Sequence, residues 1–105
     1  MYEIVQLRYF KKDIKDLRRQ KLFSKLNKLE KILNLLKSDS ISRIAKSHCI
    51  IDPLLPNCRE CHIEWDFVLI YKYDINNRLL LLRVGKHDDV YKKSWVNRDK
   101  WLVSW

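Results

Sequence analysis

The sequence has 105 residues, a length that fits one domain and excludes a second catalytic domain. Hydrophobic residues make up 47% of the chain and charged residues 33%, with one glycine and two prolines, so the composition is that of a folded chain and not of a disordered one. The net charge of +9 at pH 7 favours a polyanionic partner such as nucleic acid.

The apolar segments and the cysteines bear on where the protein works. The sequence shows no signal segment, and its longest aliphatic run, residues 79–82, is far too short to cross a bilayer. We therefore expect a cytoplasmic protein without membrane contact. Three cysteines, Cys49, Cys58 and Cys61, cannot all pair with one another, and in a reducing compartment we expect no disulfide.

The N-terminal third predicts a strand and two helices. Aromatic and β-branched residues nearly alternate over residues 2–8, which is typical of a short strand. Apolar residues then recur at helical spacing over residues 10–20, and leucines do so over residues 22–37. The leucine stripe covers about two heptads, too few for a coiled coil, so packing on a sheet is favoured. The first helix has a basic outer face formed by Lys11, Lys12, Lys15, Arg18 and Arg19.

The middle of the chain predicts a loop, followed by three strands. Polar residues and prolines mark a loop over residues 38–57. Extended segments follow at residues 58–64, 67–73 and 78–84, and the pair Asn76-Asn77 predicts the reversal between the last two.

These elements predict an α+β fold in a single domain, with a helical hairpin packed on one face of a sheet. Leucine at each of residues 79–82 places apolar side chains on both faces of the last strand, which favours a central position in the sheet. We expect the face opposite the helices to be open and to carry the functional residues. Residues 92–105 contain three of the four tryptophans, so we divide the chain into a domain at residues 1–91 and a Trp-rich extension at residues 92–105.

Four polar residues near the ends of the predicted strands can carry chemistry together: His62, Asp66, Arg83 and His87. Cleavage of RNA by its own 2′-hydroxyl needs a base, a cation on the pentavalent phosphate and an acid for the leaving oxygen. Two histidines, one carboxylate and one arginine supply these groups without a metal or another cofactor. Gly85 lies between the last two residues, and we expect it to take a positive φ and return the loop over the sheet.

Two segments closely resemble the YafQ branch of the RelE/ParE toxin superfamily, namely CRECHIEWDFVLIYK at residues 58–72 and LRVGKH at residues 82–87. The resemblance implies the RelE-like fold and the toxin of a type II toxin–antitoxin pair. It further implies an mRNA interferase that cuts mRNA in the ribosomal A site, contacts ribosomal RNA and is silenced by a cognate antitoxin.

The resemblance also implies residue roles. His62 and Asp66 match positions of proton transfer, with the first base left open between them, Arg83 matches the phosphate-stabilising arginine and His87 the general acid. The segment around His48 departs from the family motif. The resemblance further implies that Phe67 stacks on a base and that Tyr91 stands where the family often has Phe. From their charge, we also expect Lys86 and the basic residues of the first helix to contact the substrate, namely Lys11, Lys12, Lys15, Arg18 and Arg19.

Several other interpretations compete with the nuclease. The pattern Cys-x-x-Cys-His at residues 58–62 fits haem attachment, and with His48 and Cys49 it offers ligands for zinc, but a strand places Cys58 and Cys61 on opposite faces. A basic domain that binds nucleic acid without cutting it, or a ParE-like gyrase poison, is the main alternative. The two histidines and the aspartate favour the nuclease, and the sequence leaves the oligomeric state open.

Overall fold

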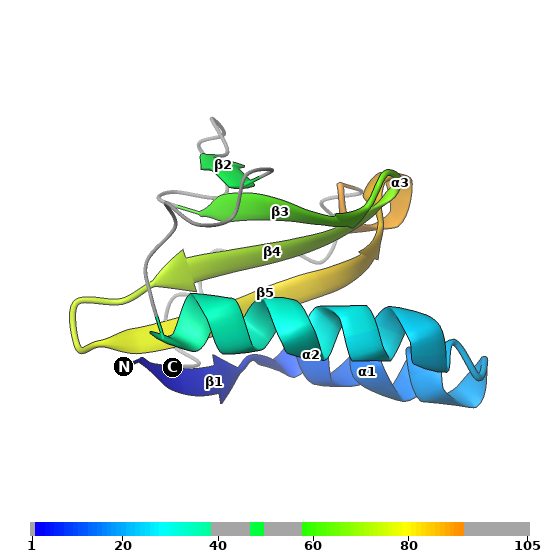
Figure 1. Ribbon diagram of the computed structural model, residues 1–105, viewed down its shortest axis with the longest axis horizontal. Helices are drawn as coiled ribbons and strands as arrows, with labels where there is room; N and C mark the ends of the chain where they lie inside the picture. Colours follow the sequence, from blue (N-terminus) through cyan, green and yellow to red (C-terminus); the bar gives the residue numbers. More distant parts are fainter. Residues whose placement is uncertain (1, 39–46, 50–57, 92–105) are drawn as a thin grey trace.

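A computed structural model describes residues 2–38, 47–49 and 58–91. The strands form one five-stranded sheet in the order β1-β5-β4-β3-β2, with α1 and α2 side by side on one face (Figure 1). The predicted α+β class and the helical hairpin on one face of the sheet are confirmed. The elements are, in chain order, β1 (Glu3–Gln6), α1 (Arg8–Arg19), α2 (Phe23–Ser38), β2 (Ser47–Cys49), β3 (Arg59–Glu64), β4 (Phe67–Tyr73), β5 (Arg78–Lys86) and α3 (His87–Val90).

The predicted strand and two helices form within two residues of their expected bounds. Strand β1 pairs in parallel with β5, and α1 begins two residues after the strand ends. The turn between the helices contains Lys21 at φ 59°, a left-handed conformation that stops α1 and reverses the chain.

The predicted meander is also present. Strands β3, β4 and β5 pair antiparallel in succession, and the chain reverses between β4 and β5 at residues 74–77, where Asn77 takes φ 59°. Asparagine tolerates this conformation better than most residues, which explains the Asn76-Asn77 signal. Strand β5 lies between β1 and β4, so its predicted central position is confirmed.

One strand lies where the sequence predicted only loop. Residues 47–49 form β2, which pairs antiparallel with the outer edge of β3 and places His48 opposite Glu60. The loop prediction for residues 38–57 is wrong at this point. Three residues are too few to show the alternation by which a strand is recognised, so this pairing is set by the neighbouring strand.

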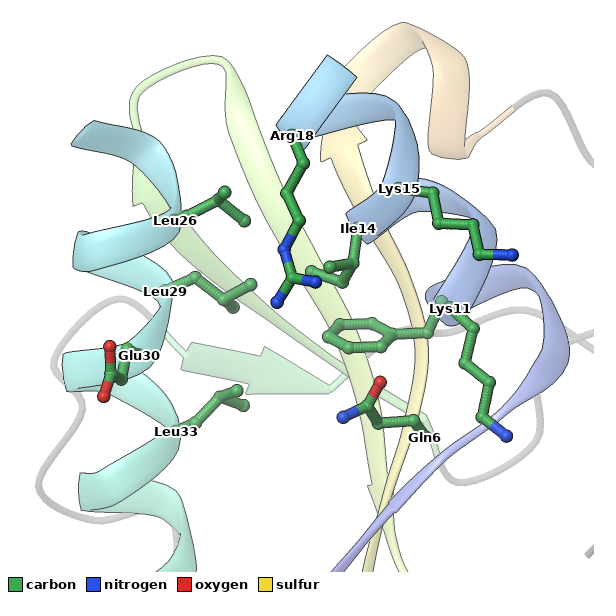
Figure 2. A pocket seen from close by; sticks show the side chains of 10 residues that line it. Gln6, Lys11, Ile14, Lys15, Arg18, Leu26, Leu29, Glu30 and Leu33 are labelled. Carbon is green, nitrogen blue, oxygen red and sulfur yellow. The ribbon is translucent and has the colours of Figure 1, made fainter. Parts of the chain in front are cut away.

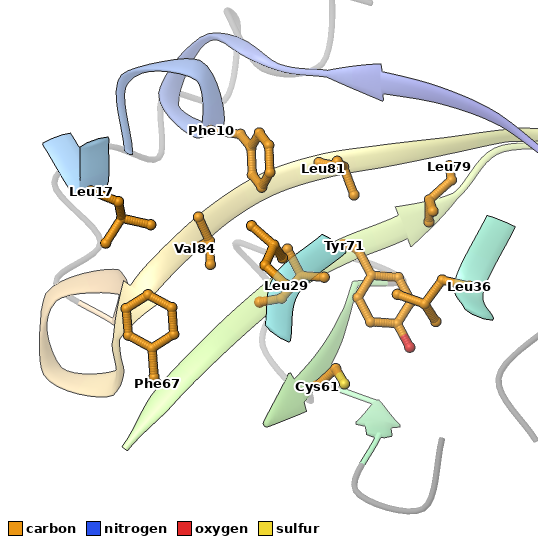
Figure 3. Close-up of a cluster of buried hydrophobic side chains, with 11 residues drawn as sticks. Phe10, Leu17, Leu29, Leu36, Cys61, Phe67, Tyr71, Leu79, Leu81 and Val84 are labelled. Atoms are coloured by element: carbon orange, nitrogen blue, oxygen red, sulfur yellow. The ribbon is translucent and has the colours of Figure 1, made fainter. Parts of the chain in front are cut away.

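The main core lies between the helices and the sheet (Figure 3). Phe10 and Leu17 of α1 and Leu29 and Leu36 of α2 point onto β4 and β5, where Tyr71 is fully buried. The helical periodicity therefore arises from packing on the sheet, as predicted.

The opposite face of the sheet is not open in its centre, contrary to expectation. Val68, Ile70, Leu80 and Leu82 are at most 2% exposed, and within the described segments they pack with residues from before α1, before β3 and in α3. Leucines on both faces of a central strand need cover on both sides, and this face therefore carries an apolar cluster on β4 and β5.

The cysteines of β3 and its approach are buried on different faces. Cys58 and Cys61 are free thiols, each fully buried, and they belong to separate apolar clusters. The geometric argument against joint chelation or haem attachment is thereby supported. Burial raises the pKa of the Cys61 thiol to about 11, which keeps it in the neutral form. Among the described residues, no helix is long and apolar enough to span a membrane.

Candidate active site

A row of polar residues crosses the sheet on the face opposite the helices. Glu60 of β3 and Arg83 of β5 both pair with Ile70 of β4, so they flank it on either side. The register shift between Ile70 and Tyr71 leaves Leu82 as an extra residue in β5, and this bulge turns Arg83 to the face that carries Glu60. With strands about 4.8 Å apart, the backbones of Glu60 and Arg83 lie roughly 10 Å from each other.

The buried carboxylate of Glu60 is the centre of this group. Its side chain is only 4% exposed, and Oε1 lies 2.8 Å from Nε2 of His62. The hydroxyl of Tyr91 donates to Oε2, and Nε2 of His87 lies 3.8 Å from the same oxygen. Burial, together with the hydrogen bond to Glu60, raises the pKa of Tyr91, so its phenol stays protonated and remains a donor.

The short helix α3, which begins at His87 and is followed by Tyr91, lies at one end of the sheet (Figure 1). The backbone N–H of His87 donates to the carbonyl oxygen of Asp66 at 2.9 Å, which ties the helix to the turn between β3 and β4. The ring of His87 lies 4.5 Å from that of Tyr91 and 6.5 Å from that of His62, measured between centroids. Two imidazoles therefore face one space above the sheet.

Gly85 does not have the conformation that the sequence predicted. It does not have a positive φ: β5 continues through it to Lys86, and α3 makes the return over the sheet. A Cβ built on Gly85 would lie 3.6 Å from a methyl group of Val90, an ordinary contact distance. The prediction of a special backbone conformation at Gly85 is wrong.

Arg83 is held by a carboxylate from α1. Its Nε and Nη2 donate to Asp13 Oδ2 and Oδ1 at 2.7 and 2.9 Å, and its guanidinium carbon lies 6.0 Å from the centre of the Tyr9 ring. Burial raises the pKa of Asp13, while the hydrogen bonds from Arg83 and the Val84 N–H act in the opposite direction. All three contacts require an acceptor, which fits the ionised carboxylate.

The remaining residue of the predicted acid–base set, Asp66, lies differently from the histidines. It is exposed in the turn between β3 and β4, and it helps line a pocket of about 150 Å³ with Lys25, Glu64 and Lys86. Its backbone carbonyl supports His87, but among the described residues its carboxylate makes no ion pair with His62 or His87. Lys86 is exposed at the end of β5 beside this group.

Phe67 does not present its ring as expected. It is 3% exposed, packs in the core between helices and sheet, and has Nζ of Lys25 at 4.7 Å from its ring centre. The parity of β4 places residue 67 on the helix face, so in this conformation its ring does not lie where a base could stack.

The basic residues of α1 form a separate surface. All five are exposed, and three of them (Lys11, Lys15 and Arg18) border a groove of about 500 Å³ between α1 and α2. Figure 2 shows leucines of α2 pointing toward α1 across this groove, with Lys11 and Lys15 directed outward. This surface lies on the helix layer and not beside His62 and His87.

Two polar residues of the site escaped the sequence analysis: Glu60 and Asp13. Asp13 occupies a buried position in the pattern of Phe10, Ile14 and Leu17, and a charge on an apolar helix stripe is the signal that could have revealed it. Glu60 lies inside the strand motif, where alternation with the buried Cys61 indicates only the face it occupies. Within the described segments, no group of three His, Cys, Asp or Glu residues is placed to hold a metal ion.

The fold is that of the RelE-like toxins. A YoeB/ParE toxin from Agrobacterium tumefaciens superposes with a TM-score of 0.70 at 13% identity over 81% of this chain and 98% of that one, a likeness of fold alone. A metal-bound toxin from Helicobacter pylori matches with a TM-score of 0.74 and 29% identity, over 87% of this chain and all of that one. YafQ from E. coli BL21(DE3) matches with a TM-score of 0.72 and 27% identity, over 87% and 99% of the two chains. No curated protein matches the sequence.

The match between the sequence and a protein-family model shows the family. Residues 2–92 match the model described as the bacterial toxin of type II toxin–antitoxin systems, YafQ. The chain therefore belongs to the YafQ family of bacterial toxins, as its resemblance implied.

Proposed function

We propose that this toxin is an endoribonuclease that cuts mRNA on the ribosome without a metal ion. The observation that carries the proposal is the convergence of His62 and His87 on the buried carboxylate of Glu60. Arg83 stands across β4 from Glu60, since both pair with Ile70. This set contains a base, an acid and a fixed cation, which are the groups that phosphodiester cleavage by a 2′-hydroxyl requires.

In the proposed reaction the 2′-oxygen attacks the adjacent phosphorus and its proton passes to the base. The bond from phosphorus to the 5′-oxygen breaks, and the acid protonates that oxygen, giving a 2′,3′-cyclic phosphate and a free 5′-hydroxyl. Arg83 stabilises the charge that gathers on the non-bridging oxygens. His87, about half exposed, is the acid and can regain its proton from solvent.

His62 is the base favoured by the geometry. A proton on Nε2 directed at Glu60 makes Nδ1 the basic nitrogen of the neutral imidazole, and the buried carboxylate stabilises the imidazolium formed on proton transfer. Asp66, the other sequence-based candidate, supports His87 through its backbone oxygen instead. Tyr91 donates a hydrogen bond to Glu60, the partner of His62, and its ring packs against His87. Tyr91 would therefore help to keep the two histidines at a fixed separation.

The nucleic acids that we propose as partners, ribosomal RNA and mRNA, are anionic. The basic surface of α1 and Lys86 would contact ribosomal RNA and the mRNA, and the protein would act in the cytoplasm. A YafQ from E. coli has been crystallised in a DinJ–YafQ toxin–antitoxin complex, 28% identical to this chain over 87% of it. We propose a cognate antitoxin for this chain as well. The toxin domain proper would comprise residues 1–91, with 92–105 as an appended segment.

Cleavage of a defined mRNA on purified ribosomes tests the proposal. The wild type should cut the message with EDTA present, and Arg83→Ala and His87→Ala should each lower the rate by about 10²- to 10⁴-fold while remaining folded. Lys31→Ala, which changes an exposed lysine of α2 away from the site, is the matched control and should keep the wild-type rate.

The alternative, a toxin that binds nucleic acid or a topoisomerase without cutting RNA, gives a different result. Its RNA substrate would stay intact with wild-type protein, and toxicity in cells would persist in both site variants. Either result overturns the nuclease assignment.

A further inference from the structure

The edge of β5 changes its partner halfway along. Up to Leu81 it pairs with β1, and the last bond of this ladder runs from the N–H of Leu7 to the carbonyl oxygen of Leu81 at 3.0 Å. The chain then enters α1, and among the described residues no strand pairs with the next part of this edge. There the backbone N–H of Val84 donates to Oδ2 of Asp13 at 3.0 Å.

The carboxylate of Asp13 also accepts two hydrogen bonds from the side chain of Arg83. Asp13 Oδ2 also accepts from Nε of Arg83 at 2.7 Å, and Oδ1 accepts from Nη2 at 2.9 Å. A guanidinium bound through Nε and Nη2 has its plane fixed by two parallel bonds. The third hydrogen bond to Asp13 comes from the backbone N–H of Val84, the residue after Arg83. The carboxylate therefore fixes the Arg83 side chain relative to the backbone of β5.

We infer that Asp13 is a positioning residue that sets the Arg83 guanidinium for the phosphate of the RNA. The inference rests on the proposed function, since it assigns a role in that reaction to a residue outside the histidine cluster. Asp13 binds the two N–H groups on one side of the guanidinium, and the planar group carries five N–H donors in all. A phosphate can thus be met by an arginine whose orientation is set before the substrate arrives.

Stability alone is a weak reason for this pair. A partly buried ion pair often contributes little net free energy of folding, because burial of both charges offsets their attraction. The chain offers a comparison at the other end of β5, where Asp74 and Arg78 form an ion pair beside the turn after β4. Both pairs join a shielded aspartate to an arginine of β5, and only the pair with Asp13 lies at the candidate site.

The test compares Asp13→Asn with Asp74→Asn in ribosome-programmed mRNA cleavage, with thermal unfolding of each variant measured alongside. We expect Asp13→Asn to lower kcat by about 10²-fold with a small change in KM, because a misplaced cation fails mainly in the transition state. Asp74→Asn should keep the wild-type kcat, even if the two variants lose similar stability.

A double-mutant cycle separates positioning from a general structural role. In an Arg83→Ala background, Asp13→Asn should cause no further fall in kcat, since no guanidinium remains to be oriented. A further fall of similar size there would overturn the inference, as would wild-type kcat in folded Asp13→Asn. If Asp13→Asn does not fold, Asp13→Glu takes its place: it keeps the charge, displaces it by one methylene, and is expected to lower kcat.

A readout independent of activity distinguishes this inference from the proposed function. Proton exchange at Nε–H of Arg83, followed by NMR, should be slow in the wild type and at least tenfold faster in Asp13→Asn. Equal exchange in the two proteins would refute the positioning role. If exchange is slow in the wild type but the wild type does not cut mRNA, Arg83 is held by Asp13 as inferred and the proposed nuclease activity is refuted.

Discussion

Removal of the Tyr91 hydroxyl tests the central contact of the candidate site. Tyr91→Phe deletes the donor to Glu60 and keeps the ring against His87. The acceptor is a carboxylate with 4% of its side chain exposed, so water replaces the lost donor poorly. A hydrogen bond to a charged group contributes about 1.5–3 kcal/mol, which for a chain of this size lowers the melting temperature by on the order of 10 °C.

Urea unfolding of four proteins isolates this contact: the wild type, Tyr91→Phe, Glu60→Gln and the double variant. Glutamine keeps an acceptor oxygen but carries no charge, so Tyr91→Phe should cost only about 0.5–1.5 kcal/mol in that background. The expected coupling free energy is therefore about 1 kcal/mol or more. Additive effects, equal to within roughly 0.5 kcal/mol, would refute a charge-assisted bond between Tyr91 and Glu60.

Two further predictions concern the helix layer. Hydrogen bonds from Lys25 and Lys28 lower the pKa of Glu64 from its ordinary value of 4.5 to about 2, so the stability from this cluster is present above pH 4.5 and is lost as the pH falls toward 2. The melting-temperature difference between the wild type and Glu64→Gln should be largest at neutral pH, shrink as the pH falls from 4.5 to 2 and vanish only below pH 2; a difference independent of pH would contradict it. Leu36→Ala, at a fully buried position, should lower the free energy of unfolding by about 2–5 kcal/mol, whereas Leu35→Ala, at a position 49% exposed, should change it by less than about 0.5 kcal/mol in urea titrations. Similar losses in the two leucine variants would contradict the packing of α2 on the sheet.

The fold was largely predictable because its elements have strong local signals. Helical spacing of the leucines marks α2, and four consecutive leucines mark β5 as a central strand. The pair Asn76-Asn77 marks the reversal, since Asn77 adopts the left-handed conformation. The three residues of β2 carry no such signal, because their pairing depends on the edge of β3.

The candidate site was predictable only in part, because its geometry depends on contacts between distant residues. The sequence placed His62 and Arg83 on extended segments, and the structure has them on β3 and β5. The bulge at Leu82 that sets the face of Arg83, and the reach of Asp13 from α1, arise from tertiary packing that no local pattern encodes. Phe67 shows the reverse case, in which the resemblance suggested an exposed stacking ring and the parity of β4 buries it.

The basic residues of α1 and the residues of the candidate site lie on different surfaces of the molecule. Three basic residues of α1 border the groove between the helices, while Glu60 and Arg83 flank Ile70 of β4 and the two histidines lie beside Glu60. RNA bound to both surfaces would have to pass around the end of the sheet near Lys86. Added salt should therefore strongly lower the affinity for RNA. Loss of a single site residue should instead lower the cleavage rate more than it lowers the affinity for RNA.

Mapping of mRNA 5′ ends in cells tests the central claim most directly. Cells expressing the wild-type chain are compared with cells expressing the double variant Arg83→Ala, His87→Ala at equal protein levels. The account predicts new 5′ ends at positions in phase with the codons, present only with the wild type. Growth arrest by folded wild-type protein without such ends would contradict it and assign the toxicity to binding without cleavage.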